Sequence, residues 1–173
     1  PHMLLAVCSD WDKFAEKGLG DLLKLAGQLP SDVSLVLVGL TEEQVRQMPP
    51  YVIPIKRVEG RQEMARLYST ADMVFNLSYE ESLGMTTIEG LSCGTPSVVY
   101  NCTASPELVT PQTGFVFERG DIIGIKDALP RLLAEAKTMA TACRERACQM
   151  FDKRNMVRQY LDLYDKLLQG RQG

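Results

Sequence analysis

Two glutamates with a glycine between them are the residues of this chain whose types and spacing best suit a hydroxyl-rich ligand. Glu81 and Glu89 are separated by seven residues, and Gly84 lies inside that interval. Glu81 is expected on a loop, whereas Glu89 is expected inside the first turns of the helix that follows. Carboxylates accept hydrogen bonds, so the two side chains suit the hydroxyl groups of a ribose and of a sugar.

The backbone between these glutamates is expected to provide a binding site for an anion. Gly84 would let a ligand approach the main chain, and the first N–H groups of the expected helix, those of Met85, Thr86 and Thr87, have no partner inside it. They face outward with the positive end of the helix dipole, which favours a diphosphate. A plainer interpretation stays open, in which both glutamates only complement the helix N-terminus and solubilise it.

The hydrophobic pattern predicts the elements that must position these groups. Short apolar runs rich in β-branched residues, typical of strands, alternate with amphipathic stretches, typical of helices. Strands are expected at residues 4–8, 35–38, 52–55, 72–77, 97–100 and 115–117. Helices are expected at residues 19–29, 42–48, 62–70, 85–93, 106–109 and 122–133. This alternation predicts an α/β fold, a Rossmann-like doubly wound parallel sheet with helices on both faces.

The end of the chain is expected to be nearly all helix, from residue 132 to residue 169, with a break at residues 151–155. Its apolar residues recur at helical spacing, namely Met156, Tyr160, Leu163, Tyr164 and Leu167. A helix with such a face needs a partner surface. Two alternatives stay open, because the face could dock on another domain of the protein or pack on its own domain.

Composition limits the classes of function. The 173 residues are 45% hydrophobic and 24% charged, which suits one globular domain, and the net charge of -3 gives no chain-wide attraction to nucleic acid or to an anionic membrane. Apolar runs fall far short of the roughly 18 residues of a membrane span and no secretory leader is recognised, so a cytoplasmic location is expected. Residues 1–3 are interpreted as a cloning scar and residues 4–173 as a single domain. Because the only histidine is His2, no histidine is expected to act as a base.

Around the two glutamates the sequence follows a known pattern. Residues 78–99 resemble the E-x7-E signature of retaining glycosyltransferases of the GT-B fold, in which the first glutamate precedes a glycine and the second precedes Cys-Gly-Thr-Pro. Further similar stretches lie at residues 16–18, 36–39, 67–72, 106–107 and 114–116. The chain resembles glycosyltransferase family 4 (group 1), and within it the C-terminal half that binds the donor nucleotide sugar.

The resemblance implies transfer of a hexosyl group from a nucleoside-diphosphate sugar to a saccharide or glycoconjugate acceptor, in the synthesis of a cell-surface polysaccharide or a lipid-linked glycan. It implies catalytic roles for Lys17, which contacts the donor diphosphate, and for Glu81, which holds the donor sugar. Glu89 is implied to bind the nucleotide ribose. The other implied donor-binding residues are Arg57 and Val58, beside the base, and Leu83, Gly84, Met85 and Thr86. For Lys17, a solvated helix-start lysine remains the plainer alternative.

The same resemblance implies which cofactors and partners to expect. No metal and no other cofactor is expected, because Lys17 and the helix amides would stabilise the diphosphate of a UDP-, GDP- or ADP-linked hexose. The N-terminal acceptor-binding domain of the same protein is expected to be missing from this chain, which would bind donor without catalysing transfer. Any contact with the inner face of the membrane is expected through that missing domain, and nucleic acid is not an expected partner.

Three departures from the family pattern leave a second class of function open. Asp12 stands where the family usually has an arginine, Leu83 replaces an aromatic residue, and Thr103-Ala104 replaces a pair of glycines. A non-catalytic nucleotide-sugar-binding or regulatory module is therefore the alternative. A dinucleotide-dependent oxidoreductase is disfavoured, because the first strand leads into no G-x-G-x-x-G turn.

Overall fold

The computed structural model describes residues 1–9, 11 and 15–169, and these contain one sheet of six parallel strands. The strands are β1 (His2–Val7), β2 (Val33–Leu40), β3 (Val52–Lys56), β4 (Met73–Asn76), β5 (Ser97–Tyr100) and β6 (Gly114–Phe117). They lie side by side in the order β3-β2-β1-β4-β5-β6. All six expected strands are present and the predicted fold class is confirmed.

The strand order reverses at the centre of the sheet. After β1 the chain builds outward through β2 and β3, and it then returns to add β4, β5 and β6 on the other side of β1. β1 begins at His2, so residues interpreted as a cloning scar pair with β2, His2 with Val33 and Met3 with Ser34. In sheets of this kind ligands bind beyond the carboxyl ends of the strands at the reversal point, which here lies between β1 and β4.

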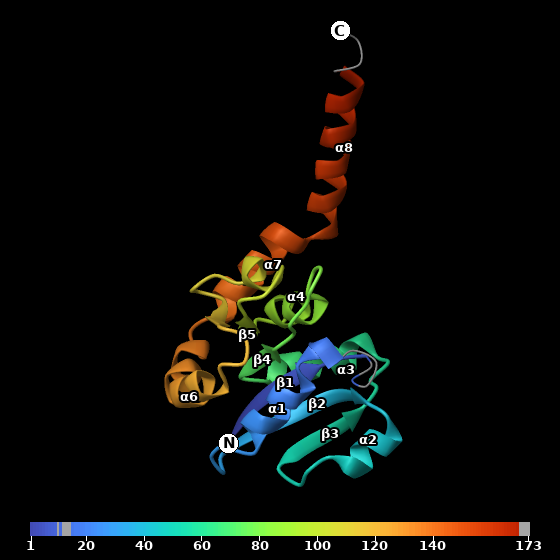
Figure 1. Cartoon of the computed structure of the whole chain (residues 1–173). Coiled ribbons are helices and arrows are strands. Elements are labelled where there is room, and N and C mark those ends of the chain that lie inside the picture. Colours follow the sequence, from blue (N-terminus) through green and yellow to red (C-terminus); the bar gives the residue numbers. More distant parts are fainter. Residues whose placement is uncertain (10, 12–14, 170–173) are drawn as a thin grey trace.

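A helix follows every strand, and the helices cover both faces of the sheet (Figure 1). They are α1 (Leu19–Ala26), α2 (Glu42–Gln47), α3 (Arg61–Thr70), α4 (Met85–Ser92), α5 (Ser105–Leu108) and α6 (Ile122–Ala136). A short 3-10 helix, η1 (Ala15–Lys17), precedes α1. The first helix ends three residues earlier than predicted, because the backbone N–H groups of Gln28 and Leu29 donate to carbonyls three residues before them, those of Leu25 and Ala26, and no longer continue the α-helical pattern.

Because side chains alternate along each strand, the sheet has a separate apolar layer on each face. On one face, Leu4, Leu35 and Phe75 pack in a core with Leu25 of α1 and Leu132 of α6. The opposite face carries a second core, which comprises Leu5, Val36, Val38, Tyr68, Ala71 and Val74. These two apolar layers fix the positions of the strand ends and of the loops that follow them.

The C-terminal part of the chain forms two helices, α7 (Ala140–Phe151) and α8 (Lys153–Gln169). The break at Asp152 falls inside the predicted window, but the turn at residues 137–139, which separates α6 from α7, was not predicted. There the hydroxyl of Thr138 donates to the carbonyl of Glu135, which competes with continuation of the helix.

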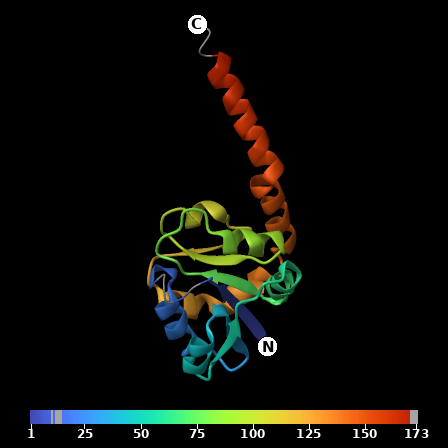
Figure 2. The same cartoon turned by 90° about the vertical axis from the view of Figure 1, so that its right-hand side faces the viewer.

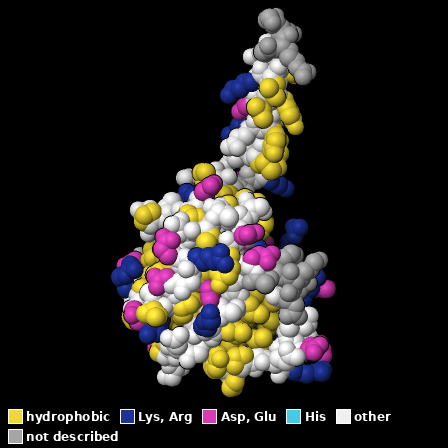
Figure 3. All heavy atoms as spheres, in the orientation of Figure 1, with side chains coloured by type: hydrophobic (Ala, Val, Ile, Leu, Met, Phe, Trp, Pro, Cys, Tyr) yellow, Lys and Arg dark blue, Asp and Glu magenta, His cyan; other side chains and the backbone are white. Residues whose placement is uncertain are grey.

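Helix α8 extends away from the rest of the molecule (Figures 1 and 2). None of its described side chains is buried, and its apolar residues form an exposed stripe that is visible in Figure 3. The stripe consists of Met156, Val157, Tyr160, Leu161, Leu163, Tyr164, Leu167 and Leu168. The alternative that this face packs on its own domain is therefore wrong. In the part of the chain that the structure describes, no helix is both long and apolar enough to cross a membrane.

Candidate functional site

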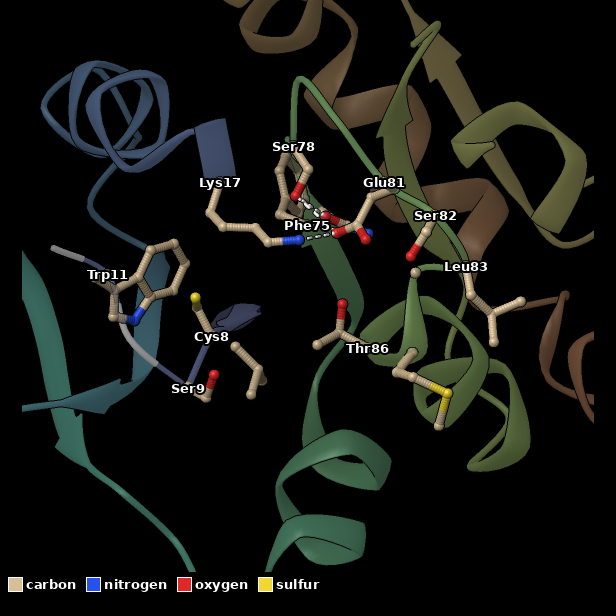
Figure 4. Close-up of a pocket in the computed structure, with 14 residues that line it drawn as sticks. Cys8, Ser9, Trp11, Lys17, Phe75, Ser78, Glu81, Ser82, Leu83 and Thr86 are labelled. Atoms are coloured by element: carbon tan, nitrogen blue, oxygen red, sulfur yellow. Dashed lines mark hydrogen bonds and ion pairs between the residues drawn. The ribbon is translucent and has the colours of Figure 1, made fainter. Parts of the chain in front are cut away.

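A cavity of about 270 Å³ opens at the carboxyl ends of β1 and β4, at the reversal point of the sheet. Figure 4 shows Lys17 and Trp11 reaching it from the β1 side and Glu81, Leu83 and Thr86 from the opposite side. Its remaining lining residues are Val7, Cys8, Ser9, Phe75, Asn76, Ser78, Ser82, Gly84 and Met85. The structure thus brings six of the predicted site residues to one cavity, namely Lys17, Glu81, Leu83, Gly84, Met85 and Thr86.

Helix α4 begins at the wall of this cavity and leaves amide groups open there. Gly84 adopts φ 70, a left-handed conformation that favours glycine, and no described side chain caps the helix. The backbone N–H groups of Met85 and Thr86 accordingly have no partner among the described residues. The amide of Thr87 was expected to be free as well, but this expectation was wrong, because it donates to the carbonyl of Gly84 at 3.1 Å.

Lys17 and Glu81 meet across the mouth of the cavity. The Lys17 ammonium donates to Glu81 Oε1 at 2.7 Å, and the Ser78 hydroxyl lies 2.9 Å from the same oxygen (Figure 4). The Glu81 side chain is 11% exposed and that of Lys17 is 26% exposed, so water only partly screens the pair. Lys17 is therefore not a freely solvated lysine, because the carboxylate of Glu81 balances its charge.

Close packing beside Gly18 brings the Lys17 segment to this position. Gly18 adopts φ 76, and a side chain there would clash with the backbone carbonyl of Leu77, just beyond the end of β4. The backbone of Tyr79 then donates to the carbonyl of Glu16 at 2.7 Å. The segment before α1 and the loop after β4 are consequently in direct backbone contact.

Buried polar groups connect the helix start to the ion pair, a feature that sequence reasoning missed. The Asn76 amide donates to the Thr87 hydroxyl at 3.2 Å and accepts from the Ser78 hydroxyl at 2.7 Å. The Ser78 hydroxyl also lies within reach of Glu81, and its one hydrogen serves one acceptor at a time. A signal was available, because Asn76 is the single polar residue of the apolar strand β4.

Glu89 lies on the exposed side of α4, outside the lining of the cavity. Its Oε2 accepts a hydrogen bond of 2.7 Å from the hydroxyl of Tyr68, a core residue of α3 that is 1% exposed. Burial and this carboxylate raise the pKa of Tyr68 well above its usual range, so the phenol stays a donor. One carboxylate oxygen of Glu89 is thereby held by the Tyr68 hydroxyl.

Two further predicted residues, besides Glu89, do not line the cavity. Arg57 is exposed and Val58 is half-buried in the connection between β3 and α3, where Val58 packs on the core of that face. Their placement beside a nucleotide base stays a prediction. Asp12, at the position of the family arginine, lies outside the described residues. Trp11 was not predicted, yet its buried ring lines the cavity and its Nε1 donates to the carbonyl of Val38 at 3.0 Å.

Thr103, at one of the two positions where the family usually has glycine, makes a contact of its own. Its hydroxyl accepts the backbone N–H of Glu81 at 2.8 Å, while its backbone adopts φ 45, an unfavourable value for a β-branched residue. The backbone N–H of Ala104 donates to the carbonyl of Glu81 at 3.4 Å. The loop that carries Glu81 is therefore held from the β5–α5 side as well.

Acidic, histidine and cysteine side chains do not gather at this cavity in a way that suits a metal ion. Over the described residues, no group of three or more such side chains is close enough together to hold one. Among the described lining residues, the Lys17 ammonium and the amides of Met85 and Thr86 are suited to an anionic ligand.

Sequence comparisons identify relatives of the chain. A family model described as "Glycosyl transferases group 1" matches residues 2–135. The chain is 30% identical over 114 residues to N-acetyl-alpha-D-glucosaminyl L-malate synthase of Bacillus anthracis, which is 63% of this chain and 30% of that protein. It is 28% identical over 136 residues to D-inositol 3-phosphate glycosyltransferase of Saccharomonospora viridis, which is 76% of this chain and 30% of that protein. The chain therefore spans about a third of the length of these relatives.

Solved structures share the fold over nearly the whole chain. Sucrose-phosphate synthase from Thermosynechococcus elongatus superposes with a TM-score of 0.81 at 24% identity, covering 98% of this chain and 46% of that one. Anabaena HepE, solved in complex with UDP-glucose, gives a TM-score of 0.78 at 20% identity and covers 95% and 49% of the two chains. With a family match over most of its length and this shared architecture, the chain belongs to the group 1 glycosyl transferases.

Proposed function

We propose that this chain is the donor-binding domain of a retaining glycosyltransferase, which transfers a hexosyl group from a nucleoside-diphosphate sugar to a saccharide or glycoconjugate acceptor. One observation carries the proposal. Lys17 and the uncapped start of α4 line the same cavity, and Glu81 lies beside them. A cation and backbone amides suit a diphosphate, whereas a carboxylate suits the hydroxyls of the attached sugar.

In this proposal the diphosphate is both a binding group and the leaving group. As its bond to the sugar breaks, negative charge grows on the diphosphate and positive charge grows on the sugar ring. Lys17 and the amides of Met85 and Thr86 stabilise the first charge from fixed positions, so metal-free binding is part of the proposal. Glu81 holds sugar hydroxyls and orients the reacting carbon, while Glu89 accepts the ribose hydroxyls.

Donor binding must open the pair between Lys17 and Glu81. The ammonium would exchange the carboxylate for the diphosphate, and the carboxylate would exchange the ammonium for sugar hydroxyls. The two exchanges are coupled because they share one ion pair of 2.7 Å. A complete donor would thus satisfy both side chains at once, whereas a nucleoside diphosphate alone would leave Glu81 without its partner.

The acceptor and the rest of the active site would come from an N-terminal domain of the same protein. The chain spans about a third of its curated relatives and just under half of the solved structures named above, which leaves room for such a domain. The exposed apolar stripe on α8 is the surface proposed to dock on it. We also propose that the domain studied alone binds donor without catalysing transfer, and that the protein acts in the cytoplasm with any membrane contact through the missing half.

A panel of thermal unfolding measurements tests the proposal. UDP, GDP and ADP and their hexose conjugates are compared, with EDTA present throughout and Lys17→Met as the control variant. A ligand present at about 100 times its dissociation constant stabilises the folded domain by about 2.7 kcal/mol, so selective binding raises the unfolding temperature. Stabilisation by one nucleotide and its sugar, lost in Lys17→Met, supports the proposal, whereas no response to any ligand contradicts it.

For the protein that includes the missing domain, transfer or hydrolysis of the selected donor separates an enzyme from the binding module kept as the alternative. Release of nucleoside diphosphate in the presence of saccharide acceptors supports the enzyme. Tight donor binding without any turnover supports the module.

A further inference from the structure

A buried carboxylate lies next to the candidate site but has no part in the chemistry proposed for it. Asp21, the third residue of α1, is 4% exposed. Its described cationic neighbour is Lys24, whose Nζ is 3.3 Å from Oδ1 and whose side chain is 70% exposed. A carboxylate buried with so weak a counter-charge is costly unless hydrogen bonds compensate it.

Two tyrosines supply that compensation at one oxygen. Asp21 Oδ2 accepts from the Tyr79 hydroxyl at 2.6 Å and from the Tyr100 hydroxyl at 2.9 Å. Burial acts to raise the pKa of Asp21, but the hydrogen bonds from Tyr79, Tyr100 and Lys24 outweigh it and hold that pKa below its usual value. The carboxylate is therefore ionised at neutral pH, and bonds to an ionised acceptor are the stronger kind.

The Tyr79 ring contacts two further side chains besides the partner of its hydroxyl. Its ring stacks on that of Tyr100 with 6.0 Å between centroids, and the Arg119 guanidinium lies 3.8 Å from its centroid. Phenylalanine could fill the same space at either position, so the hydroxyl groups serve the carboxylate and not the packing. The hydrogen bonds from the two tyrosines to Asp21 link α1 to the loop after β4 and to strand β5.

Only one of these tyrosines belongs to the segment that carries the site. Tyr79 lies two residues before Glu81, and its backbone also donates to the carbonyl of Glu16, next to Lys17. Besides the ion pair itself, the loop of Glu81 is thus attached twice to residues 16–21, once through the backbone of Glu16 and once through Asp21. Tyr100 bonds to the same carboxylate oxygen from β5, which carries neither residue of the ion pair.

We propose that Asp21, acting through the hydroxyl of Tyr79, is a positioning residue that holds the Glu81 loop against the segment of Lys17 and so sets the geometry of their ion pair. Its effect on the ligand-free loop needs no assumption about ligands. Its effect on donor binding rests on the proposed function.

Hydrogen exchange in the ligand-free chain tests the first effect. Tyr79→Phe removes the positioning bond, and Tyr100→Phe is the matched control because it removes a bond to the same oxygen from a more deeply buried residue. Exchange of the Tyr79 and Glu81 amides under native conditions reports local opening apart from global unfolding. We expect about tenfold faster exchange at both amides in Tyr79→Phe and less than about a twofold change in Tyr100→Phe. Equal acceleration in the two variants, or none in Tyr79→Phe, overturns the proposal.

Asp21→Asn provides a second variant, because it keeps the shape of the side chain and removes the charge. It is expected to accelerate the same two amides by at least as much as Tyr79→Phe does. Normal exchange at the Glu81 amide in a folded Asp21→Asn protein contradicts the inference.

Calorimetry with UDP and UDP-glucose tests the second effect. The measured quantity is the ratio of the two dissociation constants, which reports what the sugar adds to binding. We expect this ratio to approach one in Tyr79→Phe and to stay at its wild-type value in Tyr100→Phe. A ratio unchanged in Tyr79→Phe overturns the link to donor binding. A wild-type ratio of one, or no binding of either probe, instead counts against UDP-glucose as the donor within the proposed function, and hydrogen exchange still decides the positioning role.

Discussion

Lys17 and Glu81 lie 64 positions apart in the sequence, yet their charged groups are 2.7 Å apart in the structure. Each is the other's partner in the ligand-free protein, and each is assigned a different part of the donor. The carboxylate therefore competes with a diphosphate for the ammonium. This competition gives the pair measurable properties that two independent binding residues would not have.

Glu81→Gln is expected to strengthen binding of UDP and to weaken the additional binding that a hexose provides. Removal of the carboxylate frees Lys17 for the diphosphate. The affinity for UDP is expected to rise roughly threefold, which corresponds to the strength of a partly exposed ion pair. Glu80→Gln is the matched control. Glu80 is exposed and next to Glu81 in the sequence, and the change removes the same charge. Calorimetry with UDP and UDP-glucose measures both quantities, and equal weakening for the two ligands would show that Glu81 only supports the loop.

Lys17→Met should weaken binding of a nucleoside diphosphate far more than binding of the nucleoside. The lost contact is a charge-assisted hydrogen bond, which contributes about 1.5 to 3 kcal/mol. Lys126→Met, on α6 and outside the cavity lining, controls for the loss of one positive charge. Parallel losses for the two ligands, followed by calorimetry, would argue against contact with the diphosphate.

Glu89→Gln separates a ribose acceptor from a residue that only complements the start of α4. For a ribose acceptor, the change weakens UDP by about 1 to 3 kcal/mol and leaves its 2′,3′-dideoxy analogue nearly unaffected. For a helix-complementing residue, the apo domain loses a few tenths of a kcal/mol and the ratio of the two ligands is preserved. A thermodynamic cycle that combines Glu89→Gln with the change from UDP to its dideoxy analogue measures the coupling free energy between Glu89 and the ribose hydroxyls. A coupling below about 0.5 kcal/mol excludes the ribose role.

Gly18→Ala is expected to destabilise the domain by at least about 2 kcal/mol. The left-handed backbone disfavours alanine, and the new methyl group would meet the carbonyl of Leu77. Gly20→Ala is the matched control two residues later, where a methyl group meets nothing and should instead stabilise α1 by about 0.5 to 1 kcal/mol. Urea unfolding of both variants checks the prediction, and similar midpoints for the two would refute the close approach at Gly18.

Asp21 is expected to contribute an acid-sensitive part of the stability. Its folded pKa is lowered, so the stabilisation is fully present above the unfolded value of 3.8 and is lost as the pH falls through the lower folded value. The free energy of unfolding of Asp21→Asn should therefore fall less steeply below pH 4 than that of the wild type. Urea unfolding across the acid range measures this, with Asp127→Asn, an exposed carboxylate, as the control. Identical slopes for Asp21→Asn and wild type would mean that the carboxylate is not stabilised by folding.

The sequence by itself determined the fold class and the centre of the candidate site. Alternation of apolar runs with amphipathic stretches is a local property, and it was enough to predict six strands with a helix after each. The helix start at Gly84 was also readable, because a glycine and the residues after it are contiguous. For the same reason the sequence pattern was enough to predict that Glu81, Met85 and Thr86 share one site, to which the family resemblance added Leu83.

The family resemblance had implied that Lys17 joins this site, but only the tertiary structure decided how distant residues contact one another around the cavity. The pairing of Lys17 with Glu81, the bond from Tyr68 to Glu89 and the junction at Asp21 all join residues from different elements. A one-dimensional pattern does not contain the register and twist that bring such residues together. The same reason explains why the sequence could not show that Arg57 and Val58, adjacent to a strand end, are outside the lining of the cavity. It also explains why the helical pattern of α8 revealed an apolar face but could not show that this face is exposed.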